Sequence, residues 1–418
     1  MQRKTSVFLT LTLLLTLFPC CSVKTGAEGD ASANPTHLEE IDADIAAGAA
    51  EDRAIMECAV RLAAALDDRQ LAAQMIISGI DGRGQLTRDM RILLTECPAG
   101  GIILFRYNLD TDNDAIQNLI TESSSLVAQG NVVEDDTQTT ASIYPFVATD
   151  HEGRAVNRFR PGVADLPHAA SYWEMAHSRG RESAIAQINT DSVNVGKAIG
   201  NLGLNLNFAP VAEYLNADNR DFLEDRSYGP DSGFTAKAAA AFIMGMEQTG
   251  ILCVIKHFPG SAGADPHRFP SVLRGDKAAL TELAYPFAAL IQDGHARAIM
   301  VSHSAVPAWD SENIASLSPQ IMDVWLRQEL GFEGIIISDD FSMAAAGGDS
   351  LRPETQAVRS LAAGADMVLV WPPDLRRTHW AILAALDDGR LSRERLRDAA
   401  SRIIFEKLRM GLIIQEPN

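Results

Sequence analysis

Short apolar runs alternate with amphipathic stretches along most of the chain. An apolar run bounded by turn residues predicts a buried strand, and apolar positions with a helical period predict a helix with one buried face. The predicted strands are Gln74–Ser78, Gly101–Phe105, Pro145–Thr149, Leu204–Phe208, Leu252–Ile255, Ala298–Val301, Gly334–Ser338 and Met367–Val370. Helical periodicity occurs between them at Phe234–Gln248, Lys277–Gln292, Pro319–Glu329 and Glu354–Ala363.

Strands that alternate with helices in this way predict a parallel sheet. Eight strand–helix units favour an α/β fold of the (β/α)8 TIM-barrel type, as a single catalytic domain over residues 51–415. A doubly wound sheet is the competing architecture, but no glycine-rich phosphate-binding fingerprint follows the first strand. The helix predicted at Arg390–Leu408 would lie outside the barrel. The acidic and polar stretch Val132–Thr140 is interpreted as a surface insertion.

The first 20 residues have the pattern of an export signal. A basic start, Met1–Lys4, precedes an apolar run, Val7–Phe18, that is too short to span a membrane comfortably. Cys20 and Cys21 follow at once, as in a bacterial lipoprotein signal, although Pro19 stands where such signals usually have a small residue. We expect an exported protein that is lipid-anchored to a bacterial membrane through Cys20, or Cys21, on the periplasmic or outer side. Plain secretion and an uncleaved anchor are the alternatives.

Composition narrows the possible partners. Residues 21–50 are rich in Ala, Gly, Asp and Glu, which predicts a flexible linker. The net charge of −19 over 418 residues argues against a nucleic-acid partner, which would require a basic surface. The remaining cysteines, Cys58, Cys97 and Cys253, lack metal-type spacing and predict no disulfide framework. Nothing indicates the oligomeric state, for which a monomer is the simplest expectation.

Polar residues follow most of the predicted strands, at the barrel end where catalytic residues gather. They are Asp150, His151 and Glu152 after the third strand, Asn207 and Glu213 at the fourth, Lys256 and His257 at the fifth, Ser302 and His303 at the sixth, Ser338, Asp339 and Asp340 at the seventh, and Trp371 at the eighth. Acids, cations and imidazoles converging on one mouth indicate an enzyme rather than a passive scaffold.

The acids after the seventh strand and a pair on the loop after the fifth suggest specific chemistry. Asp339 ends a buried strand, where a carboxylate can act as a nucleophile or general base, while Asp340 is assigned to capping or support of the next helix. Asp265 and His267 are one residue apart, so in an extended segment both side chains point the same way. A carboxylate fixes the tautomer of a neighbouring imidazole, which makes the pair a competent proton shuttle.

Other chemistries remain open from the residues alone. Lys256 at a strand end could form a Schiff base. The imidazoles of His151, His257, His267 and His303 could suggest a metal, but no HxH or HExxH spacing supports a metal site. We therefore expect neither metal nor cofactor.

The chain resembles bacterial β-N-acetylglucosaminidases of glycoside hydrolase family 3, the single-barrel members that act on cell-wall fragments. The resemblance extends over roughly residues 70 to 410. It rests on motifs in the family's order, namely Gly100–Phe105, Ala148–Gly153 with Val156–Arg158, Asn205–Val211, Asp225–Tyr228, Lys256–Gly260 and Ser338–Met343.

The resemblance implies a retaining, exo-acting β-N-acetylglucosaminidase that removes terminal β-linked GlcNAc from peptidoglycan or related glycans. Asp339 would be the nucleophile, and His267 paired with Asp265 would be the acid/base. The positions that match the family's sugar ligands are Asp150, Arg158, Arg226, Lys256 and His257. Lys256 would then be a hydrogen-bond donor to the sugar, which removes the Schiff-base interpretation.

Three departures from the family pattern stand out. The family usually has His-Gly where this chain has Ser261-Ala262, and a serine where this chain has Pro266, in a loop about two residues shorter. Arg154 is shifted by one position relative to the family motif. Glu213 stands where the family more often has aspartate. The loop is therefore where leaving-group or aglycone preference could differ.

Three other functions compete with this assignment. A β-glucosidase of the same family generally uses a glutamate acid/base, against which the Asp265–His267 dyad argues. A phosphorolytic glycosidase remains open, because a neutral histidine tolerates an anion beside it. A surface lipoprotein that binds sugar without catalysis would not need to retain both Asp339 and the dyad.

Overall fold

The computed structural model describes residues 35–263, 265–347 and 352–417. The predicted signal peptide, Cys20 and Cys21 lie outside these residues. Within the linker expected over residues 21–50, residues 35–50 instead belong to the helix α1 (Pro35–Ala65). Alanine and glutamate are strong helix formers, which accounts for helix in this stretch. No helix in the described ranges combines the length and the hydropathy that a membrane crossing requires.

Residues from Asp52 onward form one compact unit built on an eight-stranded parallel sheet. The strands pair in the order β11-β8-β7-β6-β5-β2-β1-β12, and a parallel bridge from Ile337 to Met367 brings β11 beside β12. Their bounds are β1 Ile76–Gly79, β2 Gly101–Leu104, β5 Phe146–Thr149, β6 Leu206–Asn207, β7 Leu252–Phe258, β8 Ala298–Val301, β11 Ile335–Ser338 and β12 Val368–Val370. The predicted (β/α)8 barrel and all eight predicted strands are confirmed.

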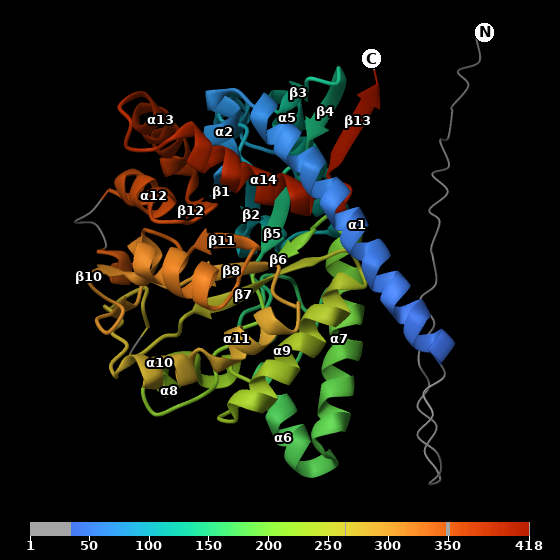
Figure 1. Ribbon diagram of the computed structural model, residues 1–418, viewed down its shortest axis with the longest axis vertical. Coiled ribbons are helices and arrows are strands. Elements are labelled where there is room, and N and C mark those ends of the chain that lie inside the picture. The colour runs from blue at the N-terminus through green and yellow to red at the C-terminus, as the bar shows by residue number, and fades with distance from the viewer. Residues whose placement is uncertain (1–34, 264, 348–351, 418) are drawn as a thin grey trace. The chain divides into compact units, whose positions relative to one another are not determined.

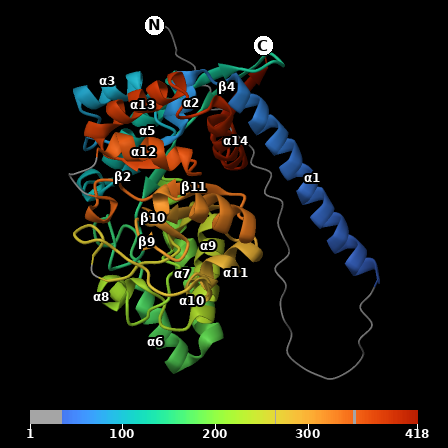
Figure 2. The same ribbon diagram turned by 60° about the vertical axis from the view of Figure 1, so that its left-hand side comes forward.

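Helices surround the strands, and α7 and α9 run side by side in both views (Figures 1 and 2). Before β6 the helices are α2 Asp68–Gln74, α3 Arg88–Glu96, α4 Arg106–Leu109, α5 Asn113–Gly130, α6 Ala169–Arg179 and α7 Arg181–Asn201. After it come α8 Arg220–Leu223, α9 Ser232–Glu247, α10 Lys277–Leu283, α11 Tyr285–Gln292, α12 Pro353–Ala362, α13 Pro372–Asp387 and α14 Arg393–Arg409. Shorter helical segments are η1 Glu224–Arg226, η2 Ala315–Leu317, η3 Gln320–Glu329 and η4 Ala344–Ala346.

Two predicted helices differ in detail from the structure. The stretch predicted at Lys277–Gln292 is broken at Ala284 into α10 and α11. Pro286 has no N–H to donate to the carbonyl of Glu282, so one continuous helix cannot form there. The segment predicted at Pro319–Glu329 is a π-helix, η3, which ends with the amide of Leu330 donating to the carbonyl of Trp325, five residues earlier.

The stretch Val132–Thr140 is not simply a surface insertion. It forms β3 (Val132–Glu134) and the start of β4 (Thr139–Ile143), and β4 also pairs with the C-terminal strand β13 (Ile413–Pro417). Val133 is buried between two exposed neighbours. The strand β13 pairs with β4 from about 270 residues farther along the sequence, so local pattern could not reveal this pairing. A second small hairpin joins β9 (Ala305–Val306) to β10 (Asp310–Ile314).

The barrel strands are buried along their whole length, as expected for a parallel sheet covered by helices. Gly100, just before β2, shows how close this packing is, because a Cβ there would lie 2.4 Å from the carbonyl oxygen of Gln74. The apolar strands thus form a rigid base, and the chemistry is left to residues that follow them.

Lys407 of α14 is fully buried near the amino-terminal ends of the strands. Its Nζ donates to Oε1 of Gln74 at 2.8 Å and lies 5.1 Å from the ring centroid of Phe146. Burial lowers the pKa of Lys407 to about 7. Between that value and the ordinary pKa of about 10.4, the unfolded state binds a proton that the folded state does not, so the free energy of unfolding rises with pH.

We expect Lys407→Met to flatten this dependence, by up to about 1.4 kcal/mol per pH unit between pH 7 and pH 10. Denaturant unfolding at pH 7, 8 and 9 measures it. Lys237→Met removes an exposed lysine and should keep the wild-type slope. A slope in Lys407→Met equal to that of Lys237→Met would show that Lys407 is charged in the folded protein throughout this range.

Candidate active site

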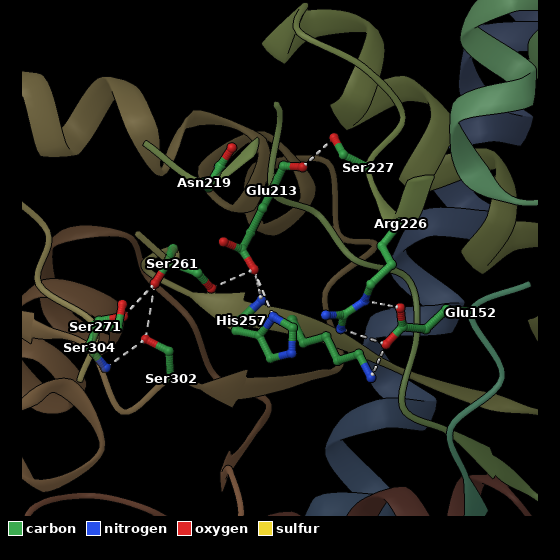
Figure 3. Close-up of polar contacts among 12 residues, drawn as sticks. Glu152, Glu213, Asn219, Arg226, Ser227, His257, Ser261, Ser271, Ser302 and Ser304 are labelled. Carbon is green, nitrogen blue, oxygen red and sulfur yellow. Dashed lines mark hydrogen bonds and ion pairs between the residues drawn. The ribbon is translucent and has the colours of Figure 1, made fainter. Parts of the chain in front are cut away.

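A cluster of ion pairs lies at the carboxyl-terminal ends of β5 and β7. Nζ of Lys256 lies 2.9 Å from Oδ1 of Asp150 and 2.7 Å from Oε1 of Glu152. Arg226 binds Glu152 in a bidentate manner, with Nε donating to Oε2 at 2.7 Å and Nη2 donating to Oε1 at 2.9 Å (Figure 3). Nη2 of Arg158 donates to Oδ2 of Asp150 at 3.2 Å. Three cations and two carboxylates therefore hold one another in place.

Burial makes this cluster strongly interdependent. Lys256 is 3% exposed, and its burial alone would lower its pKa, but Asp150 and Glu152 outweigh that effect and raise the pKa of Lys256. Burial likewise opposes ionisation of Asp150 and Glu152, yet Lys256 with Arg158 lowers the pKa of Asp150, and Arg226 with Lys256 lowers the pKa of Glu152. All of these groups are therefore charged at neutral pH.

Removing the central cation should destabilise the fold. Lys256→Met leaves two carboxylates short of a partner, which is expected to lower the free energy of unfolding by about 3–5 kcal/mol at pH 7. A carboxylate with a lowered pKa adds stability above its unfolded pKa of about 4 and loses it as the pH falls through the folded value. Without Lys256 the pKa values of Asp150 and Glu152 rise, so the folded variant takes up protons as the pH falls toward 4 while the folded wild type does not, and the deficit of the variant should shrink there. Thermal unfolding at both pH values measures it, with Lys237→Met as control, and an equal deficit at both would contradict it.

Backbone geometry fixes the position of Glu152. The next residue, Gly153, has φ +120°, and a Cβ on it would lie 2.2 Å from the carbonyl oxygen of Pro167. The amide of Glu152 donates to the carbonyl of Val156, closing a tight turn in which Arg154 is exposed. The shift of Arg154 noted in the sequence thus places its side chain away from the ion-pair cluster.

His257 and Glu213 form a second buried pair. Nδ1 of His257 lies 2.7 Å from Oε1 of Glu213, and the backbone amide of His257 donates to the same oxygen at 3.3 Å. Oγ of Ser261 donates to it as well, at 3.1 Å (Figure 3). The peptide bond between Lys256 and His257 is cis. Because Nδ1 donates to a carboxylate, Nε2 is the ring atom of His257 that remains for a ligand.

Asp339 and Asp340 follow β11 and have different surroundings. Oδ1 of Asp339 accepts the amide of Asp340 at 2.8 Å, and no ion pair to Asp339 is found within the described ranges. Asp340 instead accepts the amide of Ser342 at 2.9 Å, the hydroxyl of Ser342 at 2.7 Å and the indole N–H of Trp371 at 2.5 Å. Both carboxylates are half-buried. Asp340 is thus occupied in supporting the loop, and Asp339 retains a free carboxylate oxygen.

Asp265 and His267 are in contact on the loop after β7, but they lie in a turn and not in the extended segment expected from the sequence. Oδ1 of Asp265 accepts both Nδ1–H of His267, at 2.8 Å, and the amide of His267, at 3.0 Å. Burial alone would raise the pKa of Asp265, but these two hydrogen bonds outweigh that effect and lower the pKa. The side chains are 44% and 65% exposed, so the imidazole can reach a bound ligand.

The dyad loop also contacts the loop that follows Asp339. The amide of Ala344 donates to the carbonyl of His267 at 3.2 Å, and the amide of Ala345 donates to the carbonyl of Pro266 at 3.0 Å. No side-chain contact links His267 to Asp339. The two are related through the backbones of their loops.

Two further imidazoles are structural. Burial lowers the pKa of His151 to about 4 and also lowers the pKa of His303. His303 lies 2.7 Å from Oγ of Ser316 and 2.9 Å from the carbonyl of Asp340, which ties β8 to the loop after β11. Within the described parts of the chain, no three His, Cys, Asp or Glu side chains gather as metal ligands would.

The sequence placed most of these residues at the mouth but missed some of their partners. Glu152 and Glu213 were named as strand-end acids without a role, and the structure shows that they bind Arg226, Lys256 and His257. The position of Glu152, two residues after Asp150, was an available signal. Nothing local in the sequence connects Glu213 with His257, 44 residues later.

Comparison with known proteins finds the same family that the sequence motifs resemble. The sequence model for the glycosyl hydrolase family 3 N-terminal domain matches residues 67–405. A beta-hexosaminidase from Methylococcus capsulatus is 33% identical over 294 residues, which cover 68% of this chain and 79% of that protein. One from Thioalkalivibrio sulfidiphilus is 34% identical over 314 residues, covering 72% and 82%.

Solved structures of similar proteins have the same fold. A glycoside hydrolase family 3 beta-N-acetylglucosaminidase from Paenibacillus sp. superposes with a TM-score of 0.73 at 27% identity, covering 83% of this chain and 63% of that one. A beta-N-acetylhexosaminidase from Beutenbergia cavernae gives a TM-score of 0.69 at 26% identity, covering 83% and 99%.

Proposed function

The chain belongs to glycosyl hydrolase family 3, and we propose that it is a retaining, exo-acting β-N-acetylglucosaminidase. The observation that carries this proposal is the barrel mouth itself. A buried lysine at the end of β7 is held by two carboxylates, and Asp339 follows β11 with one carboxylate oxygen that has no partner among the described residues. A histidine–aspartate dyad stands on a loop whose backbone contacts the loop after Asp339. A charged, polar cradle with one attacking group and one proton carrier is what hydrolysis of a neutral sugar requires.

The ion-pair cluster holds the sugar. Asp150, Arg158, Arg226, Lys256 and His257 supply acceptors and donors for its hydroxyl and acetamido groups. Ion pairs among them and with Glu152 and Glu213 fix these side chains before the sugar arrives, so little ordering remains to be done on binding. Nε2 of His257 is the only ring atom of that residue left for the sugar, since Nδ1 is held by Glu213.

Asp339 attacks the anomeric carbon in the first step. A bond forms between a carboxylate oxygen of Asp339 and that carbon, while the bond to the aglycone oxygen breaks and its electron pair stays on the oxygen. His267 gives that oxygen a proton. In the second step His267 takes a proton from water, the water oxygen attacks the anomeric carbon, and the bond to Asp339 breaks. Two displacements leave the sugar in its original β configuration.

Asp265 prepares His267 for both steps. Its carboxylate accepts Nδ1–H, which leaves Nε2 as the nitrogen that gives and takes the proton. The lowered pKa of Asp265 keeps this carboxylate charged at neutral pH, where it stabilises the imidazolium form.

Four parallel incubations separate this activity from its alternatives. The purified protein is incubated with aryl β-GlcNAc and with aryl β-glucoside, each with and without phosphate. We expect phenol release from aryl β-GlcNAc that does not require phosphate. Preference for the glucoside would indicate a β-glucosidase, glycosyl phosphate as product would indicate phosphorolysis, and activity on neither would leave a sugar-binding protein.

We further propose that the protein acts outside the cytoplasm on peptidoglycan or a related glycan, anchored by lipid at Cys20. The basic and apolar start of the chain followed by two cysteines supports this location. Cys20→Ser should release the protein from the membrane fraction, whereas Cys21→Ser should not. Membrane retention of Cys20→Ser with release of Cys21→Ser would move the anchor to Cys21, and retention of both single variants and of the double variant would exclude a lipid anchor.

A further inference from the structure

We propose that Glu213 is a positioning residue that couples the sugar-binding imidazole of His257 to the loop carrying the acid/base dyad, with Ser261 as the link. The proposal rests on the proposed function, since it concerns the same site. The side chains of His257 and Ser261 and the backbone amide of His257 converge on one oxygen of Glu213 (Figure 3).

Glu213 uses its two oxygens very unequally. Oε1 accepts Nδ1–H and the amide of His257 and the hydroxyl of Ser261, whereas Oε2 is buried and has no hydrogen-bond partner among the residues that the structure describes. Glu213 is 2% exposed, His257 7% and Ser261 4%. A buried carboxylate whose hydrogen bonds all fall on one oxygen has its orientation set by those donors. The ring plane and tautomer of His257 therefore depend on Glu213.

Ser261 lies at the base of the dyad loop. The next amide, that of Ala262, donates to Oγ of Ser271 at 3.1 Å, which closes the loop on its far side. Oγ of Ser271 lies 2.8 Å from Oγ of Ser304, and Oγ of Ser304 donates to the carbonyl of Gly260 at 2.9 Å (Figure 3). The start of the dyad loop is thus held by buried hydroxyls on one side and by Glu213 on the other.

This arrangement joins the two halves of the chemistry. His257 is one residue from Lys256 and faces the sugar, while Asp265 and His267 lie just beyond the loop base. A shift of Glu213 would turn the imidazole and release the loop base together. Glu213 touches neither the reacting atoms nor the dyad, so it acts through the groups it holds.

The two departures from the family pattern noted at Glu213 and Ser261 meet in this contact. Glutamate is one methylene longer than aspartate, and a serine side chain is shorter than a histidine side chain. The longer acid reaches the shorter donor here, since Oγ of Ser261 donates to Oε1 of Glu213. The two departures would then compensate each other.

A double-mutant cycle tests this pairing. The variants are Glu213→Asp, Ser261→His and the combination of both, assayed on aryl β-GlcNAc with thermal unfolding measured in parallel. Each single variant should lose about 10- to 100-fold in kcat/KM, and the double variant should recover to within several-fold of wild type. A double variant as poor as the product of the two single losses would overturn the compensation.

The separate values of KM and kcat distinguish the contact of Glu213 with His257 from its contact with Ser261. Ser261→Ala leaves the bond between Glu213 and His257 in place, so KM should hold while kcat falls about tenfold. Glu213→Asp disturbs His257 too, so KM should rise as well. Ser302→Ala is the matched control, because it removes a buried hydroxyl that donates to the carbonyl of Gly260, while the hydroxyl of Ser304 still donates to that carbonyl. This variant should change kcat less than threefold. Equal effects of Ser261→Ala and Ser302→Ala would remove the specific role of Ser261.

Imidazole ¹⁵N spectra give a readout that does not depend on activity. With His257→Gln used for assignment, wild type should show His257 protonated at Nδ1, and Glu213→Asp should show a mixture of tautomers. An unchanged tautomer in Glu213→Asp would overturn the positioning role. If wild type fails to hydrolyse aryl β-GlcNAc, the proposed function is wrong, while the spectra still decide whether Glu213 positions His257.

Discussion

Asp339→Asn is expected to lower kcat on aryl β-GlcNAc by about 10⁴-fold or more, because the attacking group is lost and the covalent intermediate cannot form. Asparagine has nearly the same shape and keeps an oxygen for the amide of Asp340, so the fold should persist. Steady-state kinetics measure the loss, and thermal unfolding checks that the variant is folded.

Asp340→Asn is the matched control for this loss. Asp340 follows Asp339 and is equally half-buried, but its oxygens are engaged by Ser342 and Trp371. Its replacement should affect kcat far less than that of Asp339. Added azide should restore turnover to Asp339→Gly and yield the α-glycosyl azide, since azide would attack from the face that Asp339 leaves open. A larger loss in Asp340→Asn than in Asp339→Asn would reverse the assignment.

His267→Ala should slow the reaction in a way that depends on the leaving group. Positioned proton transfer contributes about 10²–10⁴-fold, and a leaving group of high pKa needs the proton most. Sugar and alkyl aglycones should therefore lose the full factor, while nitrophenyl glycosides should lose much less in the first step. A series of aryl glycosides whose leaving groups differ in pKa tests this.

Two controls accompany this series. Asp265→Asn keeps a hydrogen-bond acceptor but removes the charge, so it should show a weaker version of the same dependence on leaving group. His177→Ala removes an exposed imidazole on α6 and should leave the kinetics unchanged. A uniform loss across all leaving groups in His267→Ala would mean that His267 does not protonate the aglycone.

The barrel was predictable because each strand carries its own signal. A run such as Ile335–Ser338 is apolar on both faces and short, and its helix neighbours show a clear period. The ends of the same strands identified Asp150, Lys256 and Asp339 as residues of one mouth, because parallel strands place their carboxyl ends together. The predicted barrel topology therefore placed these residues at one end of the barrel, which their spacing along the sequence does not show.

The remaining features depend on contacts between distant segments. The pairing of β4 with β13, the contact of Glu213 with His257 and the packing of Lys407 against Gln74 each join residues with unrelated local patterns. The helix over residues 35–50 was not predicted, because the composition of this stretch also suits a linker. Local pattern fixes the elements, and long-range packing decides which polar groups find partners.

The most direct test of the account is a search for the covalent intermediate. Protein turning over a slowly hydrolysed aryl β-GlcNAc is quenched in acid, digested and analysed by mass spectrometry. The account predicts one N-acetylhexosamine attached to Asp339. An adduct on another residue, or complete turnover without any adduct and with the α-configured sugar as first product, would contradict it.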